Sequence, residues 1–189
     1  DIPAAEWDAC ANPPPASLER LGASASPIFA DVCSVGSKST YNPFVSHAFF
    51  AAAEASGSAN PRTGWGPRHL VARRGGRIVG IVPCYLKSHS QGEYVFDRGW
   101  ADAYHRAGGR YYPKLQVSVP FTPATGPRLL HRTGEPVVET QAALAEGLKE
   151  LTRRHGVSSA HATFVPETEM PVFEAAGYLH RTDQQFHFI

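Results

Sequence analysis

The chain has 189 residues, of which 42% are hydrophobic and 19% are charged, and its formal net charge is +1. This amount of apolar material suffices for the core of one domain and excludes a wholly disordered chain. A near-neutral balance without a basic run argues against DNA binding, which requires a surface that neutralises many phosphates. No stretch approaches about 18 consecutive apolar residues, so we expect no transmembrane helix.

The cysteines are Cys10, Cys33 and Cys84, an odd number without CxxC spacing. They indicate reduced thiols in a reducing compartment. The first ten residues, DIPAAEWDAC, are acidic and lack the apolar segment of a secretory signal. We therefore expect a cytoplasmic protein.

The N-terminal part combines a proline-rich stretch with two helix signals. Residues 1–16 contain three consecutive prolines and are interpreted as an ordered arm or a linker, and the domain is expected over residues 17–189. Ser17 could cap a short helix over residues 17–22. After Asn42-Pro43, a clearer helix is predicted up to Gly57, because residues suited to a helix recur at steps of three and four.

A β-hairpin is the clearest strand signal. Two β-rich runs, RHLVARR and RIVGIVPCYLK, flank Gly75-Gly76. Glycine reaches positive φ without steric cost, so this pair suits a type I′ or II′ turn. Apolar side chains occur on both faces of the runs, which predicts strands inside a sheet that is covered on each side.

The second half alternates strands and helices. Residues 136–155 give the strongest helix signal, with leucines along one face, cations in the last turn and Gly156 after it. The other predicted elements are a strand at 93–97, a helical or irregular stretch at 98–108, a strand at 114–119, an irregular PFTPATGPR, a strand at 157–165, a helix at 168–176 and a strand at 183–189.

This order of elements predicts an α/β fold. The strand–helix–strand units require crossover connections, which are right-handed in nearly all proteins. We therefore expect a mixed, twisted sheet with helices on both faces.

The order is also similar to that of the GNAT (acyl-CoA N-acyltransferase) fold, including a helix that ends in the Gly177-Tyr178 step. The run PKLQVSVPFTPATGPRLL, together with NPFVSHAFFAAAEASGS, resembles the FemAB-like family of peptidoglycan biosynthesis or recognition. The resemblance implies a predicted N-acyltransferase that transfers an acyl or aminoacyl group directly to an amine. It also implies that this chain is the first of two GNAT-like halves.

The same resemblance suggests the substrates. Acyl-CoA or aminoacyl-tRNA would be the donor, with tRNA involved only in that role, and a small molecule or peptidoglycan precursor would be the acceptor. A CoA-binding GNAT domain needs a pyrophosphate loop of the form [RQ]xxGx[GA], whose amides bind the diphosphate. RRGGRI has Ile78 and RAGGRY has Tyr111 at the last place, so we expect no bound cofactor in this segment.

The stretch FDRGWADAYHRAGGRYYPK is the first candidate site. Asp102 or His105, three residues apart on one helical face, could be the base that deprotonates the amine. Arg106 and Arg110 could bind a phosphate or carboxylate, and Trp100 could stack on a sugar. The alternative is a solvated helix face with aromatic core residues.

The second candidate surrounds PFTPATGPR, where a strand runs into a loop rich in proline and glycine. Such a strand end is a common place for a ligand pocket in α/β sheets. The substrate-binding residues predicted there are Gln116, Ser118, Thr122 and Arg128, with Arg128 as the anion contact. The alternative is a structural turn fixed by prolines and capped by threonine hydroxyls.

Other chemistries lack support. No two of the nine histidines have HxH, HxxxH or HExxH spacing, so no metal site is predicted. Cys84 lies in an apolar strand and is expected to be packed rather than nucleophilic. Two further interpretations stay open: a non-catalytic module that binds a peptide or glycan, and a homodimer that covers an apolar face.

Overall fold

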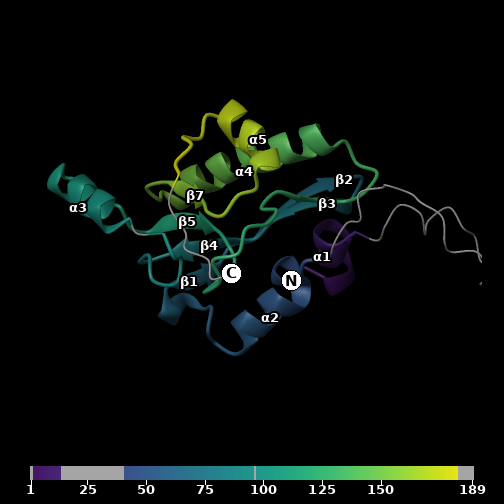
Figure 1. Ribbon diagram of the computed structural model, residues 1–189, viewed down its shortest axis with the longest axis horizontal. Coiled ribbons are helices and arrows are strands. Elements are labelled where there is room, and N and C mark those ends of the chain that lie inside the picture. Colours follow the sequence, from purple (N-terminus) through teal and green to yellow (C-terminus); the bar gives the residue numbers. More distant parts are fainter. Residues whose placement is uncertain (1, 14–40, 96, 183–189) are drawn as a thin grey trace, which may run out of the picture.

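The computed structural model describes residues 2–13, 41–95 and 97–182. Helices α1 (Ala4–Ala11) and α2 (His47–Ala55) lie on one side of the strands, and α4 (Val137–His155) and α5 (Met170–Ala175) lie on the other (Figure 1). The predicted α/β class with helices on both faces is confirmed.

The strands among the described residues form two sheets rather than the single sheet that we predicted. The first, in the order β1-β4-β5-β7, contains β1 (Trp65–Pro67), β4 (Cys84–Lys87), β5 (Lys114–Val117) and β7 (Ala160–Ala162). The second, in the order β2-β3-β6, contains β2 (Leu70–Arg74), β3 (Arg77–Val82) and β6 (Leu130–His131). Pro83 separates β3 from β4, and because proline has no N–H for a ladder, the chain passes there from one sheet to the other.

Strand directions follow the sequence argument in both sheets. All pairs are antiparallel except β5 with β7, which is parallel and is joined by the crossover that contains α4. The hairpin of β2 and β3 turns at Gly75 and Gly76, whose φ angles of 56° and 82° are those of a type I′ turn. The predicted hairpin is confirmed.

The main predicted helices are present. Ser46 caps α2, its hydroxyl accepting the Phe49 N–H, and a short 3₁₀ turn at Pro43–Val45 precedes it. Gly156 ends α4 in the left-handed region, with φ 59°. The predicted helix at 168–176 appears as a 3₁₀ turn followed by α5, and helix α3 (Arg98–Arg106) occupies the stretch expected to be helical or irregular.

Two strand predictions need correction. The described residues 93–95 form bends and residue 97 lies in no strand, because Glu93 and Asp97 turn their carboxylates inward onto a lysine. The strand predicted at 157–165 is confined to β7. The predicted helix at 17–22 and the strand at 183–189 lie outside the described residues.

Helix α1 was not predicted. Its Trp7 is 2% exposed and donates its indole N–H to the Val45 carbonyl at 2.8 Å. Asn12 and Asn42 exchange two hydrogen bonds at the ends of α1 and of the segment before α2. These contacts build the first residues into the core.

Two apolar clusters lie on opposite sides of the strands. Trp7, Phe50 and Trp65 belong to the cluster beneath α1 and α2, whereas Leu115 and Leu144 belong to the cluster beneath α4 and α5. Cys84 is a buried free thiol in the second cluster, as predicted for a packed cysteine. Among the described helices, none has the length and hydropathy to cross a bilayer.

Candidate functional site

Strand β5 is polar on one face and apolar on the other. Lys114, Gln116 and Ser118 alternate with Leu115 and Val117, and all five are buried. Successive strand residues point to opposite faces, so the apolar pair packs under α4 and α5 while the polar side chains share the other face. A buried polar face requires partners, and these partners define the candidate site.

A charged cluster forms around Lys114. Its ammonium lies 2.8 Å from Glu93 Oε2 and 2.6 Å from Asp97 Oδ2, and all three side chains are buried. Burial acts to raise the pKa of Asp97, but the hydrogen bond and charge of Lys114 outweigh it and hold that pKa below its usual value. Burial raises the pKa of Glu93 despite the lysine. Asp97 therefore carries the fixed negative charge of the cluster.

Lys87 is the less well paired of two buried lysines. β4 sets it opposite Lys114, yet its ammonium lies 4.0 Å from Glu93 Oε1. It donates to the Gln91 carbonyl at 3.0 Å and lies 3.5 Å from the centre of the Trp65 ring. Burial lowers the pKa of Lys87 to about 8. Glu93 Oε1 has no hydrogen-bond partner in the described part of the chain.

Two tyrosines connect this cluster to the surface. The hydroxyls of Tyr111 and Tyr112 donate to Asp97 at 2.9 and 3.1 Å. Burial raises the pKa of Tyr112 to about 12, and burial and the Asp97 hydrogen bond raise that of Tyr111. Both tyrosines therefore stay protonated, and the lone pairs of their oxygens remain available to accept hydrogen bonds.

An open hollow of about 340 Å³ lies beside these tyrosines. Its lining residues are Ala101, Asp102, His105, Arg110, Tyr111 and Tyr112. Three of the residues that we predicted as catalytic or substrate-binding, Asp102, His105 and Arg110, thus come together there. All three are exposed, and within the described residues no hydrogen bond joins Asp102 to His105.

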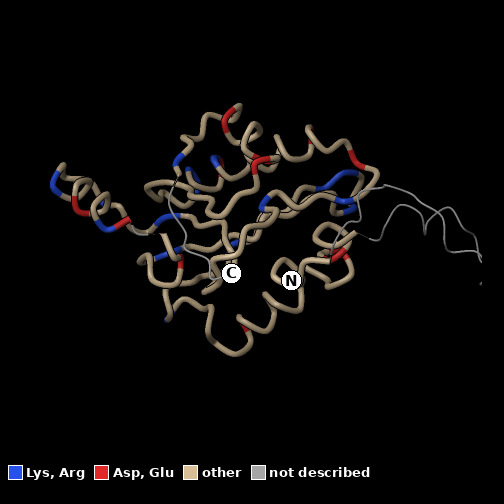
Figure 2. The backbone as a smooth tube through the Cα atoms, in the orientation of Figure 1, with Lys and Arg blue, Asp and Glu red and all other residues tan. Residues whose placement is uncertain are grey.

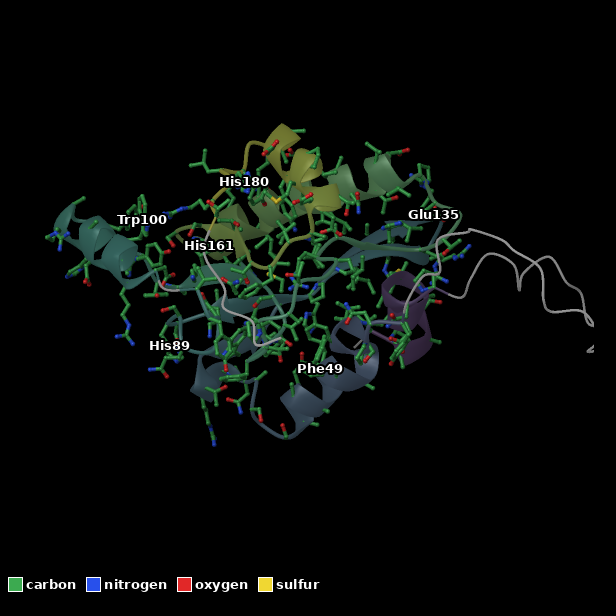
Figure 3. All side chains as sticks on the ribbon, in the orientation of Figure 1. Phe49, His89, Trp100, Glu135, His161 and His180 are labelled. Atoms are coloured by element: carbon green, nitrogen blue, oxygen red, sulfur yellow. The ribbon has the colours of Figure 1, made fainter. Side chains whose placement is uncertain are left out.

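The other residues predicted on α3 lie outside the hollow. Trp100 and Arg106 are exposed, and the guanidinium of Arg181 lies 4.1 Å from the centre of the Trp100 ring. The helix projects from one end of the body (Figure 1), and Figure 3 labels Trp100 beside it. The roles assigned to Trp100 and Arg106 stay predictions.

The second predicted group does not join the hollow. The guanidinium of Arg128 is buried and donates to the carbonyls of Thr163 and Ala124 at 2.9 and 2.6 Å. Burial lowers the pKa of Arg128 to about 10, so it remains charged at neutral pH. These contacts give Arg128 a structural role in the loop. Thr122 donates to the Pro120 carbonyl, which fits the alternative of a capped turn.

Gln116 and Ser118 stay incompletely paired. The Gln116 amide donates to Thr163 Oγ1 at 3.0 Å, but its oxygen and the Ser118 hydroxyl have no partner among the described residues. His161 lies opposite Gln116 in the β5–β7 pairing, and its Nε2 is hydrogen-bonded to the Ser159 hydroxyl at 2.9 Å. Burial and the charge of Lys114 lower the pKa of His161 to about 4, so it is neutral at neutral pH.

Sequence reasoning missed Lys87, Glu93 and Lys114. The available signal was the alternation in KLQVSV, which places polar residues on one face of a strand flanked by apolar elements. The two lysines are 27 residues apart in the sequence, so no local pattern links them, and the β4–β5 register sets them opposite each other. Among the described residues, no group of three or more histidine, cysteine or carboxylate side chains is arranged to hold a metal ion.

Comparison with known proteins identifies the family to which the chain belongs. A family model described as FemAB-like, peptidoglycan biosynthesis/recognition, matches residues 1–189. No curated protein and no solved structure matches the chain significantly. The family match spans every element described above, α1 included. The chain therefore belongs to the FemAB-like family of peptidoglycan biosynthesis/recognition.

Proposed function

We propose that this chain is an N-acyltransferase domain of GNAT type, and that the hollow beside α3 binds the amine-bearing acceptor, a peptidoglycan precursor. The observation that carries the proposal is the convergence of Asp102, His105 and Arg110 with two tyrosines anchored on a buried ion pair. Family membership supplies the substrate class.

The side chains of the hollow suit an amine acceptor. The amine attacks as the free base, so Asp102 or His105 takes the proton from its nitrogen. The nitrogen bonds to the acyl carbon while the bond to the leaving group breaks with its electron pair. Arg110 binds a carboxylate or phosphate of the acceptor, and the oxygens of Tyr111 and Tyr112 accept its N–H or O–H groups.

The donor is proposed to be acyl-CoA or aminoacyl-tRNA that approaches the open side of the hollow. No pyrophosphate loop supports CoA binding, because Gly75-Gly76 of RRGGRI forms the turn of the β2–β3 hairpin. This observation favours a second candidate function, a module that recognises the precursor without catalysing transfer.

Binding and transfer are tested separately. Binding of a soluble disaccharide-peptide to the chain is measured by calorimetry, and transfer from acyl-CoA or aminoacyl-tRNA by mass spectrometry. Arg110→Gln should weaken binding roughly ten-fold or more. His105→Gln and Asp102→Asn should preserve binding, and one of them should abolish transfer. Arg62→Gln, an exposed arginine on another segment, is the matched control.

Each outcome has a distinct meaning. Binding that depends on Arg110, with transfer that depends on Asp102 or His105, supports the enzyme. Binding without transfer from either donor supports the recognition module. Binding that Arg110→Gln leaves unchanged would show that the hollow is not the acceptor site.

A further inference from the structure

Helix α3 is amphipathic. At about 100° per residue, Trp100, Ala103, Tyr104 and Ala107 fall on one side of the helix axis, and the charged residues, with His105, fall on the other. The polar side contributes Asp102 and His105 to the hollow. The apolar side is therefore a separate surface of the same helix.

This apolar side contacts the rest of the protein only in part, through the Tyr104–Tyr111 ring contact and the Arg181 guanidinium over Trp100. No residue of α3 is buried, and Trp100 and Tyr104 are 56% and 48% exposed. The helix extends away from the sheets and from the other helices (Figure 1). A helix in a soluble domain normally buries its apolar stripe, so a stripe left in solvent indicates an interaction surface.

The charges on the polar side of the helix and in the segments beside it are mainly positive. Arg98, Arg106 and Arg110 are exposed and form no ion pair within the described residues, and Arg181 lies over Trp100. Asp102 is the acidic residue of the helix, and Figure 2 shows blue basic and red acidic positions along the helix that projects from the body. The partner that complements this surface is anionic and accepts aromatic side chains.

We propose that α3 is an interfacial helix that docks on an anionic phospholipid bilayer, with Trp100 and Tyr104 at the headgroup level. Tryptophan and tyrosine favour this level because their rings are apolar with one polar atom, and arginine is attracted to anionic lipids. A second copy of the chain fits less well. Four side chains, on this nine-residue helix and its C-cap Ala107, fall short of the roughly 800 Å² per partner that a stable interface buries.

Docking has a consequence for the acceptor, which rests on the proposed function. The hollow lies on the polar side of the same helix, so a docked α3 holds it about one helix diameter from the bilayer and facing away from it. A precursor presented at a lipid surface would then reach Arg110 and the two tyrosines. The docking itself does not depend on the hollow being an active site.

The protein carries its own probe for docking. Of its three tryptophans, Trp7 and Trp65 are 2% and 0% exposed, so Trp100 alone can change its surroundings at a membrane. Vesicles of phosphatidylglycerol and phosphatidylcholine should shift the emission to shorter wavelength and carry the chain down on centrifugation. Pure phosphatidylcholine vesicles should do neither, and added salt should weaken the binding.

Variants of α3 should unfold at the wild-type temperature, because the helix buries no side chain. Trp100→Ala should lower the vesicle partition coefficient about ten-fold, and Arg106→Ser about five-fold. The controls are Tyr41→Ser, a 63% exposed aromatic residue elsewhere, and Arg62→Ser.

Three results would overturn the proposal: no sedimentation with anionic vesicles, equal binding to neutral vesicles, or equal loss in the controls. A dimer in light scattering that Trp100→Ala dissociates would assign the stripe to a second copy. Acceptor binding by calorimetry tests the hollow independently of vesicles, so the two proposals can fail separately.

Discussion

At the residue scale, Lys114 holds two carboxylates in the interior. Because it is buried and paired with both Glu93 and Asp97, Lys114→Met removes the close ion pair of each carboxylate and leaves Glu93 only Lys87 at 4.0 Å. We expect a loss of about 3–5 kcal/mol in the free energy of unfolding, measured by urea denaturation. Lys149→Met, at an exposed ion pair with Glu146, should cost less than about 1 kcal/mol. Equal losses would show that the buried cluster adds nothing.

Lys87 contributes to stability with the opposite sign to that of Lys114. Burial lowers its pKa in the folded chain to about 8, below the ordinary value of 10.5. Between these values the unfolded state binds more protons than the folded state, so the contribution of Lys87 to stability rises with pH in that window. Below about pH 8 the lysine is charged in both states, and its burial opposes folding.

The prediction is that the melting temperature of Lys87→Met exceeds that of the wild type at pH 7 and that the difference shrinks from about pH 8 towards pH 10. Tyr112, whose pKa is raised to about 12, acts in the opposite direction above pH 10, so measurements stop there. Differential scanning fluorimetry on both chains across this range provides the test. Parallel curves would mean that Lys87 is not the titrating group.

At the element scale, the packing of α4 on β3 depends on Gly80. A Cβ at this position would lie 2.9 Å from Leu144 Cδ1 and from Thr140 Cγ2, and 3.2 Å from the Leu130 carbonyl oxygen. The carbonyl belongs to the β-ladder and cannot move aside. Gly80→Ala should therefore destabilise the fold by about 1–3 kcal/mol in urea denaturation.

Gly99→Ala is the matched control for this substitution. Gly99 lies in α3, and a Cβ there would meet no atom within 4 Å. Alanine favours a helix over glycine by about 0.5–1 kcal/mol. This variant should keep or raise the stability of α3, as hydrogen exchange would show, and a loss equal to that of Gly80→Ala would contradict the packing argument.

Elements with strong local signals were predictable from the sequence. The β2–β3 hairpin needed only its Gly-Gly turn, and α4 needed only its apolar stripe and Gly156. Residues 93–97 were misassigned because their composition suits a strand. Their actual conformation depends on hydrogen bonds from Lys114 to Glu93 and Asp97, which are 21 and 17 residues away in the sequence. Helix α1 was missed because its anchor, the carbonyl of Val45, lies 38 residues further along the chain.

The candidate site was predictable only in part, for the same reason. Asp102, His105 and Arg110 were named because they cluster in one short stretch, and the hollow brings them together. Lys87 and Lys114 meet through sheet register, which no local pattern reveals. Arg128 looked like an anion contact, but the loop carbonyls that occupy its guanidinium become neighbours only on folding.

At the scale of the whole molecule, buried and half-buried carboxylates make opposing contributions to acid stability. Glu54 joins α2 to the sheet region, accepting from His69 at 2.9 Å and from Tyr85 at 3.0 Å. Burial acts to raise its pKa, but these partners outweigh burial and lower it. The stability that Glu54 supplies is therefore present above its unfolded pKa and is lost as the pH falls through its folded pKa. Burial raises the pKa of Glu93 and Glu169, so these groups favour folding as they become protonated.

The acid response of the molecule depends on the balance between the carboxylates with a lowered pKa and those with a raised pKa. One variant from each set measures its contribution. Glu54→Gln removes a group that loses stability in acid, so its melting temperature should fall less steeply than that of the wild type from about pH 5 downwards. Glu93→Gln removes a group that gains stability in acid, so its curve should fall more steeply. Calorimetry of the three chains at matched ionic strength measures both slopes. Because the two variants shift the slope in opposite directions, a general loosening of the fold cannot produce the expected pair of results, and two equal slopes would contradict the assignment.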